Sequence, residues 1–285
     1  MAEPLPLKIG ITGITGFLGT HLAETARWAG HTVIGYSRNP KPATVPGCST
    51  VRPYVPGQLN VEDLDAMVHL AGESVFSRWS RRKKERILSS RVEGTRAVVD
   101  ALLRVAPDKR PRVLLTASAI GFYGDTGDAE ATEETPPGRG FLAEVTQAWE
   151  AEASRAESGG IRVVRLRFGL MLSREGGALR LMRPFFMLGL GATVGDGRQW
   201  VSWVHVRDAA NLALFALHDE RVTGPVNVTA PTPLRNREWT QAIARHWHRE
   251  ARWTVPAPLL RLAMGEAASL VLTSQRVFPR KAVDL

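Results

Sequence analysis

The chain of 285 residues contains a single cysteine, Cys48, and no uninterrupted apolar run long enough to cross a membrane. One cysteine excludes an intrachain disulfide and gives no reason to expect an oxidising compartment. The best apolar candidate, Leu259 to Leu272, is interrupted by Arg261 and Glu266, whereas a spanning helix needs about 20 consecutive apolar residues. The N-terminus also lacks the features of a signal peptide. We therefore expect a cytoplasmic protein without a membrane partner.

Charge of one sign is not concentrated anywhere, although the net charge is +9. The only dense basic run, Arg78 to Arg86, is interrupted by Trp79 and Glu85. Nucleic-acid binding calls for basic clusters on one face or for interleaved aromatic residues. We interpret the run as a solvated helix face beside a phosphate site and predict no nucleic-acid partner. No metal is predicted either, because His246 and His248 stand two residues apart and point to different faces of a helix.

Short β-branched segments alternate with longer helical segments, which is typical of βαβ units and a parallel sheet. The predicted strands are Lys8–Thr12, Thr32–Tyr36, Ala66–Leu70, Arg112–Thr116, Arg162–Arg167 and Val201–Val206. The predicted helices are Phe17–Ala29, Arg81–Val105 with a break, Gly140–Glu157, Val206–His218, Arg235–Arg249 and Leu259–Leu272. The sequence therefore predicts the α/β class, with a Rossmann-type doubly wound parallel sheet.

A glycine-rich turn follows the first predicted strand, where residues 13–19 read GITGFLG and open into a helix. The first glycine permits a tight turn, the second lets the backbone approach a pyrophosphate, and the third allows close helix packing. Backbone N–H groups at the positive end of the helix would face the phosphates. The alternative is a tight turn without a ligand. We predict dinucleotide contacts at Gly13, Thr15, Gly16, Phe17, Leu18 and Gly19.

The end of the second predicted strand lacks the acidic residue that an NAD site usually has about 20 residues after the turn. Ser37 and Arg38 stand there instead. An arginine can meet a 2′-phosphate with two parallel, charge-assisted hydrogen bonds. The alternative is an exposed loop arginine. We therefore predict NADP(H) as the cofactor, with Ser37 and Arg38 at its 2′-phosphate.

Two parts of the chain are expected to differ in role. Residues 1–168 and 200–229 are predicted to form the NADP-binding Rossmann domain, and residues 169–199 and 230–285 a smaller substrate-binding cap. The irregular segment 124–140 follows a central strand, and such loops are where α/β sheets usually place ligands.

Several further motifs carry a family resemblance. They are His69 to Glu73 (HLAGE), Arg78-Trp79, Ser90-Arg91, Phe122 to Asp125 (FYGD), Gly195 to Gln199 (GDGRQ) and Trp203 to Val206 (WVHV). With the glycine turn, the sequence resembles the atypical extended short-chain dehydrogenase/reductases, in particular the epimerase family of YfcH-like proteins within the NAD-dependent epimerase/dehydratase superfamily. The resemblance spans nearly the whole chain.

That resemblance implies further site residues. Leu70, Ala71, Gly72 and Glu73 would line the ribose and pyrophosphate, with Arg78 nearby and Leu170 near the nicotinamide. It also implies a homodimer through the helices near 81–105 and 140–157, and a last helix beyond residue 285.

The usual acid–base pair of the superfamily is absent. Most active members use a tyrosine followed four residues later by a lysine, which together exchange a proton with a carbonyl group. The chain has three tyrosines, Tyr36, Tyr54 and Tyr123, and none is followed by lysine at that spacing. Phe141 and Val145 occupy the corresponding places on the predicted helix.

Ser118 and Tyr123 remain as predicted catalytic residues. The resemblance implies that Ser118 hydrogen-bonds the substrate oxygen, and Tyr123 could donate a proton if the charge of a bound nicotinamide lowers its pKa. The alternative for Tyr123 is a wall of the pocket. We therefore expect an NADP(H)-dependent oxidoreductase or epimerase-like enzyme for an unidentified small molecule, or else a non-catalytic NADP(H)-binding redox sensor or regulatory module resembling the cell-division-inhibitor relatives.

Overall fold

The computed structural model describes residues 5–39 and 45–285. Its centre is a seven-stranded parallel sheet in the order β12-β7-β5-β4-β1-β2-β3. The strands are β1 (Lys8–Thr12), β2 (Thr32–Ser37), β3 (Thr50–Pro53), β4 (Ala66–His69), β5 (Val113–Ala119), β7 (Arg162–Phe168) and β12 (Gly224–Val228). This architecture confirms the predicted α/β class and Rossmann-type sheet.

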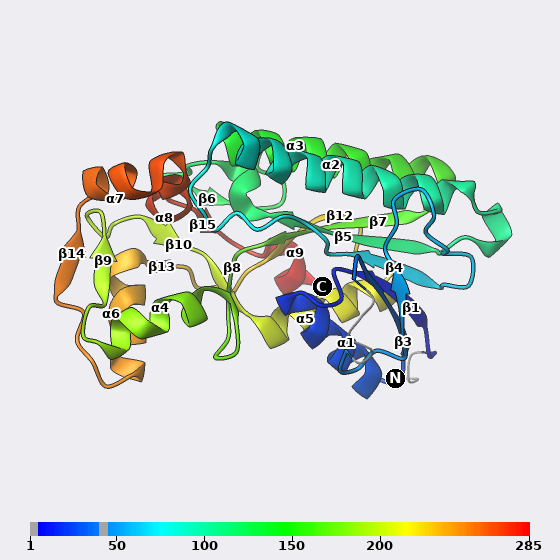
Figure 1. Ribbon diagram of the computed structural model, residues 1–285, viewed down its shortest axis with the longest axis horizontal. Coiled ribbons are helices and arrows are strands. Elements are labelled where there is room, and N and C mark those ends of the chain that lie inside the picture. The colour runs from blue at the N-terminus through cyan, green and yellow to red at the C-terminus, as the bar shows by residue number, and fades with distance from the viewer. Residues whose placement is uncertain (1–4, 40–44) are drawn as a thin grey trace.

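Helices cover both faces of the sheet (Figure 1). One face carries α1 (Phe17–Trp28) and α5 (Val206–His218), and the other carries α2 (Arg81–Arg104) and α3 (Phe141–Ser154), which lie side by side. Alternate residues of each strand point to opposite faces, so Val33 joins the core under α1 and α5 while Ile34 joins the core under α2 and α3. Burial on both faces explains why the central strands β4 and β5 are mostly apolar.

A second group of smaller elements lies at one end of the sheet, on the left in Figure 1. Its helices are α4 (Gly177–Met187), α6 (Asn236–His246), α7 (Ala257–Met264) and α8 (Ser269–Leu272). Short strand pairs join it: β8 (Leu170–Leu172) with β11 (Trp203–His205), β9 (Ala192–Val194) with β14 (Trp253–Val255), and β10 (Trp200–Val201) with β13 (Leu234–Arg235). The division into a Rossmann domain and a cap at the predicted boundaries stays a prediction.

The C-terminal segment returns to the main sheet. After α8 it forms β15 (Arg276–Val277), which pairs in parallel with β6 (Glu130–Ala131), and then α9 (Arg280–Asp284), which packs beside β12. Val277 is completely buried. The segment is therefore part of the packed interior and not an appendage.

Three predicted elements were wrong in detail. The helix predicted with a break is continuous from Arg81 to Arg104. The helix predicted over 259–272 ends at Met264, because Gly265 has φ +61° and a 3-10 turn follows it. The strand predicted over 201–206 is two strands separated at Ser202, whose hydroxyl bonds the backbone of the C-terminal segment. Within the described residues, no helix is both long and apolar enough to cross a membrane.

Candidate functional site

The glycine turn between β1 and α1 is closed tightly. Gly13 has φ +68°, a conformation that favours glycine, and its carbonyl accepts a hydrogen bond from the Gly16 N–H at 2.8 Å. A Cβ on Gly19 would collide with that carbonyl. Gly16 is also the N-cap of α1 and has no side chain to bond the first helical N–H groups. These groups are left available for an anion at the positive end of the helix.

The turn lies against the segment that follows β4. A Cβ on Gly13 would lie 3.0 Å from the Ala71 nitrogen, and the Leu70 N–H donates to the Thr12 carbonyl at 3.3 Å. The structure thus brings the predicted residues Leu70 and Ala71 directly beside the glycine turn, with Gly72 next along the chain. The other side of the turn meets the second group of elements, where the Phe17 ring packs against Gly176 at the start of α4.

The predicted 2′-phosphate residues end β2, the neighbour of β1. Arg38 is exposed, and the Ser37 hydroxyl donates to the Asn39 carbonyl at 2.9 Å. The positive charge of Arg38 acts on the Glu73 carboxylate. The ammonium of Lys83, 2.7 Å from the Glu73 carboxylate, holds the pKa of Glu73 below its ordinary value, and Arg86 and Arg38 lower it further. Basic side chains from β2 and α2 therefore converge on the loop after β4.

Two other predicted residues lie farther along the same region. Leu170 follows the end of β7, is half-buried, and packs with the apolar side chains between α4 and α6. Arg78 is exposed, and its side chain lies beside Gly265, where an added Cβ would be 3.7 Å from the Arg78 Nε. Arg78 thus lies beside the end of α7, and its contact with the cofactor stays a prediction.

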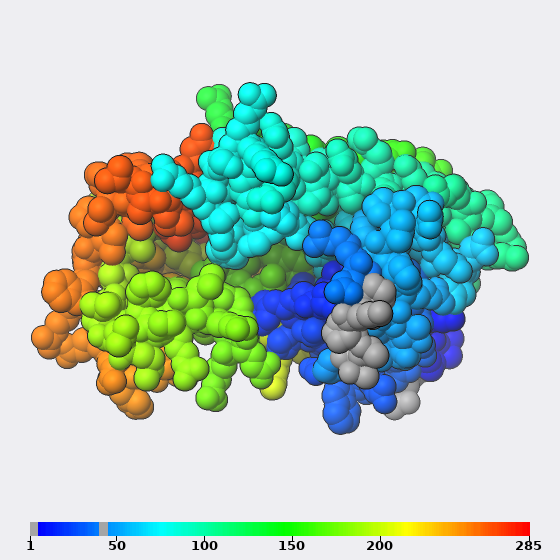
Figure 2. Space-filling model, viewed as in Figure 1, coloured from blue at the N-terminus to red at the C-terminus, as the bar shows by residue number. Residues whose placement is uncertain are grey.

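A cleft separates the main sheet from the second group of elements. Figure 2 shows it as a hollow bounded by the start of α2 and the loop before it (cyan), by α4 (lime), and by the start of α1 (dark blue). The carboxyl ends of parallel strands face this side, where open α/β sheets bind ligands. The glycine turn is therefore at the edge of the cleft.

Ser118 lies in a buried polar cluster under α3. Its hydroxyl donates to Oε1 of Glu150 at 2.6 Å, and Arg167 donates to both carboxylate oxygens of Glu150 at 2.8 Å. Glu150 comes from the buried face of α3, and Arg167 from β7. Sequence reasoning missed both residues. Their signal was an ionisable residue at an otherwise apolar position in each element.

Tyr123 joins the same cluster from the other side. Its hydroxyl donates to Oδ1 of Asn227 at 2.6 Å and accepts from Nη1 of Arg167 at 2.9 Å. The Asn227 amide in turn donates to the Phe278 carbonyl at 3.0 Å. Burial raises the pKa of Tyr123, and the Arg167 charge opposes that shift. The structure thus brings Ser118 and Tyr123 into one network, and their catalytic roles stay a prediction.

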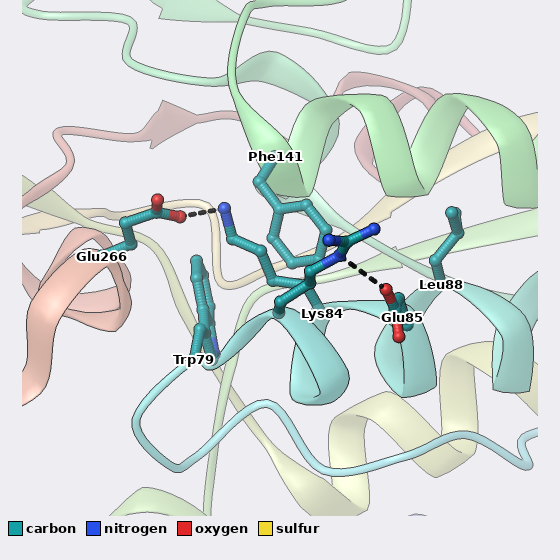
Figure 3. Close-up of a pocket in the computed structure, with 7 residues that line it drawn as sticks. Trp79, Lys84, Glu85, Leu88, Phe141 and Glu266 are labelled. Atoms are coloured by element: carbon teal, nitrogen blue, oxygen red, sulfur yellow. Dashed lines mark hydrogen bonds and ion pairs between the residues drawn. The ribbon is translucent and has the colours of Figure 1, made fainter.

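A separate hollow of about 370 Å³ opens between the starts of α2 and α3 and the C-terminal segment (Figure 3). Phe141, at the place where the resemblance puts a tyrosine, lies edge-on to Trp79 with ring centres 5.2 Å apart. Lys84 lies 4.9 Å above the Phe141 ring and pairs with Glu266. Phe141 has no hydroxyl, so this hollow does not supply the usual acid. No group of three or more His, Cys, Asp or Glu side chains suited to a metal occurs in the described part of the chain.

Comparison with protein families matches residues 9–229 to the NAD dependent epimerase/dehydratase family. The chain belongs to this family. The match confirms the resemblance that the sequence motifs indicated. Residues 255–285 match a domain of unknown function, DUF1731, and they include the part of the C-terminal segment that contacts Ser202 and Asn227.

Members of the family from distant organisms align over nearly the full chain. The epimerase family protein YfhF of Bacillus subtilis is 38% identical over 97% of this chain and 92% of its own length. A chloroplastic SDR39U1 homolog of Arabidopsis thaliana is 35% identical over 98% of this chain and 82% of its own length. The crystal structure of human epimerase family protein SDR39U1 with NADPH has a TM-score of 0.87 and 29% identity, covering 97% of this chain and 92% of that one.

Proposed function

We propose that the protein binds NADP(H) and acts as an oxidoreductase or epimerase-like enzyme on a small molecule. The observation that carries the cofactor choice is the end of β2, where Ser37 and Arg38 replace the carboxylate of an NAD site. The glycine turn beside it has uncapped N–H groups for the pyrophosphate. A human relative that binds NADPH supports the same choice. We also propose a cytoplasmic location and a homodimer through α2 and α3.

The residues present fit such a cofactor. The start of α1 would hold the pyrophosphate, Ser37 and Arg38 the 2′-phosphate, and the Leu70–Glu73 segment the ribose. Leu170, the first residue of β8, would approach the nicotinamide from the cleft. When bound, the nicotinamide supplies hydride transfer, and the protein supplies orientation and control of protons.

Ser118 and Tyr123 are the proposed groups for proton control. Each donates its hydroxyl proton to a protein acceptor, Ser118 to Glu150 and Tyr123 to Asn227. The Ser118 oxygen can therefore accept a hydrogen bond from a ligand, whereas the Tyr123 oxygen already accepts one from Arg167. Donation by either hydroxyl requires that its present acceptor be released.

Because both hydroxyl protons are already bound by protein acceptors, a second candidate function is favoured. A protein that senses the NADPH/NADP ratio needs the nucleotide site but no free proton donor. A non-catalytic redox sensor or regulatory module would therefore keep the glycine turn and Arg38, and would tolerate a Ser118 and a Tyr123 held by their neighbours.

Titration of the purified chain with NADPH and NADH, followed by nicotinamide fluorescence, tests the proposal. We expect tighter binding of NADPH. The NADPH complex is then mixed with a panel of carbonyl compounds. Oxidation that depends on one compound supports the enzyme, and selective binding without turnover on any compound favours the sensor. Equal binding of both nucleotides would contradict the assignment of Ser37 and Arg38.

A further inference from the structure

Arg91, near the middle of α2, is a cation without an ion-pair partner among the described residues. Its guanidinium lies above the Trp149 ring, 5.1 Å from the ring centre. Nη1 donates to two backbone carbonyls, that of Glu73 at 3.0 Å and that of Ile87 at 3.2 Å. Among the described residues, no carboxylate lies within ion-pair distance of it. Burial lowers the pKa of Arg91 to about 10, which still leaves the group charged at neutral pH.

The acidic residue near Arg91, Glu73, already has another cation as its ion-pair partner. The carboxylate of Glu73 is bound by the Lys83 ammonium at 2.7 Å and attracts Arg91 only from a distance. The direct partners of the Arg91 guanidinium are two carbonyl groups and the Trp149 ring. A charge removed from water without a partner is costly, and a ligand of opposite charge would recover part of that cost. Arg91 is therefore suited to an anion that is not part of the chain.

Two nitrogen atoms of Arg91 are free to meet such an anion. Nε and Nη2 donate to no described residue, and neither is among the fully enclosed polar atoms that lack a partner. They therefore reach the surface. A guanidinium edge with two N–H groups in one plane matches two oxygens of a phosphate.

The location of Arg91 identifies the surface it reaches. A Cβ added to Gly72 would lie 3.6 to 3.7 Å from Cζ, Nη1 and Nη2 of Arg91. Gly72 is exposed and follows Ala71, whose nitrogen lies against Gly13 in the glycine turn. Arg91 thus stands beside the loop after β4, the same loop that lies against the glycine turn.

We propose that Arg91 binds the diphosphate of the dinucleotide, sharing its charge with the N–H groups at the start of α1. This inference rests on the proposed function, because it needs a dinucleotide in the cleft. Glycine at position 72 is then required for a second reason, since a side chain there would stand between the guanidinium and the diphosphate. Trp149 holds the guanidinium plane in place while its free edge faces the ligand.

The test uses Arg91→Met, which keeps a long apolar side chain over Trp149, and Arg91→Lys, which keeps the charge but not the planar fork. Arg104→Met is the matched control, because Arg104 is an exposed arginine at the far end of α2 whose side chain bonds, among the described residues, only the Gly57 carbonyl. Binding of NADPH and of 2′-phospho-ADP-ribose, which lacks the nicotinamide, is measured by calorimetry. Thermal unfolding is recorded with and without NADPH.

We expect Arg91→Met to weaken both ligands by about tenfold or more, since a hydrogen bond to a charged group contributes that much. Arg91→Lys should lose less affinity for the two ligands, and Arg104→Met should bind both as tightly as the parent does. The melting temperature of ligand-free Arg91→Met should not fall, because the variant removes an unpaired charge, while the upward shift caused by NADPH should shrink.

Other results would overturn the inference. Unchanged affinity in Arg91→Met, with or without a lower melting temperature, would make Arg91 a structural residue. A loss for NADPH but none for 2′-phospho-ADP-ribose would place Arg91 at the nicotinamide end and not at the diphosphate. If the parent chain binds neither NADPH nor NADH, the proposed function itself fails, and the inference fails with it.

Discussion

Ser118 donates its hydroxyl proton to the Glu150 carboxylate over 2.6 Å, and the two side chains meet inside the protein between β5 and α3. Arg167 neutralises the same carboxylate with two hydrogen bonds. The three residues are 3%, 5% and 3% exposed, respectively. The hydroxyl of Ser118 has one proton, so only its lone pairs remain for a ligand while Glu150 is ionised.

Glu150→Gln should destabilise the fold. It leaves the Arg167 guanidinium buried without a counter-ion, and we expect the free energy of unfolding to fall by about 3 kcal/mol. Urea denaturation followed by tryptophan fluorescence measures this. Glu152→Gln on the same helix is the control, since Glu152 is half-buried and its partners Arg96 and Arg155 are near the surface, where ion pairs contribute less. Equal losses in the two variants would contradict the buried pairing.

Tyr123→Phe should also be costly. The change leaves Oδ1 of Asn227 without its donor and Nη1 of Arg167 without its acceptor, so we expect a loss of about 2 kcal/mol in the free energy of unfolding. Tyr54→Phe is the comparison, because the Tyr54 hydroxyl makes one longer bond, 3.2 Å, to the Gly94 carbonyl. A Tyr123→Phe protein that keeps NADPH binding and all turnover would rule out Tyr123 as the proton donor.

Arg38→Ala should change nucleotide preference and not general affinity. We expect NADPH binding to weaken by about tenfold, because a charge-assisted pair with the 2′-phosphate is lost. NADH has no such phosphate, so its affinity serves as the internal control. An unchanged ratio of NADPH to NADH affinity, measured by fluorescence titration, would show that Arg38 is only a loop residue.

A histidine pair links the end of α5 to the loop before β2. Nε2 of His31 and Nε2 of His218 are 3.0 Å apart, and Nδ1 of His31 accepts the Leu7 N–H at 3.1 Å. Burial lowers the pKa of both, and for His31 the neighbouring His218 lowers it further. One shared proton fits this geometry, whereas two charged rings would repel each other.

The pair should make stability depend on pH. The unfolded chain takes up these protons near pH 6.5, while the folded chain resists protonation. The contribution of the neutral histidine pair to the free energy of unfolding is therefore fully present above that pH and is lost as the pH falls below it. Melting temperatures between about pH 8 and pH 5 should drop less steeply in a His31→Asn, His218→Asn variant than in the parent. Parallel curves would mean that the pair does not titrate on unfolding.

Local signals predicted much of the fold. Strand Lys8–Thr12 and helix Val206–His218 were predicted to the residue, because apolar periodicity and a cap or turn mark their ends. β12 was missed, because Pro225 and Asn227 interrupt its apolar pattern. Asn227 is acceptable there only because its backbone N–H donates to Glu133 and its side chain meets Tyr123. Such partners are distant in sequence and leave no local signal.

The residues of the candidate site also fall into those that local sequence signals predict and those that they do not. The glycine turn and Arg38 could be predicted because each role depends on a few consecutive residues after a strand. The roles of Glu150, Arg167 and Arg91 could not be predicted, since each residue acts through a partner on another element. Arg91 was recognised only as part of the Ser90-Arg91 motif, and its role depends on Gly72 and Trp149, which are distant in sequence.

The C-terminal segment also bears on how the chain folds during synthesis. The Ser202 hydroxyl donates to the Gln275 carbonyl and accepts from the Val277 N–H, and the Asn227 amide bonds the Phe278 carbonyl. These polar groups lack their partners until residues 275–278 have been made. A nascent chain that ends before them therefore carries an unfinished core, open to chaperones, although every strand of the central sheet has already been translated.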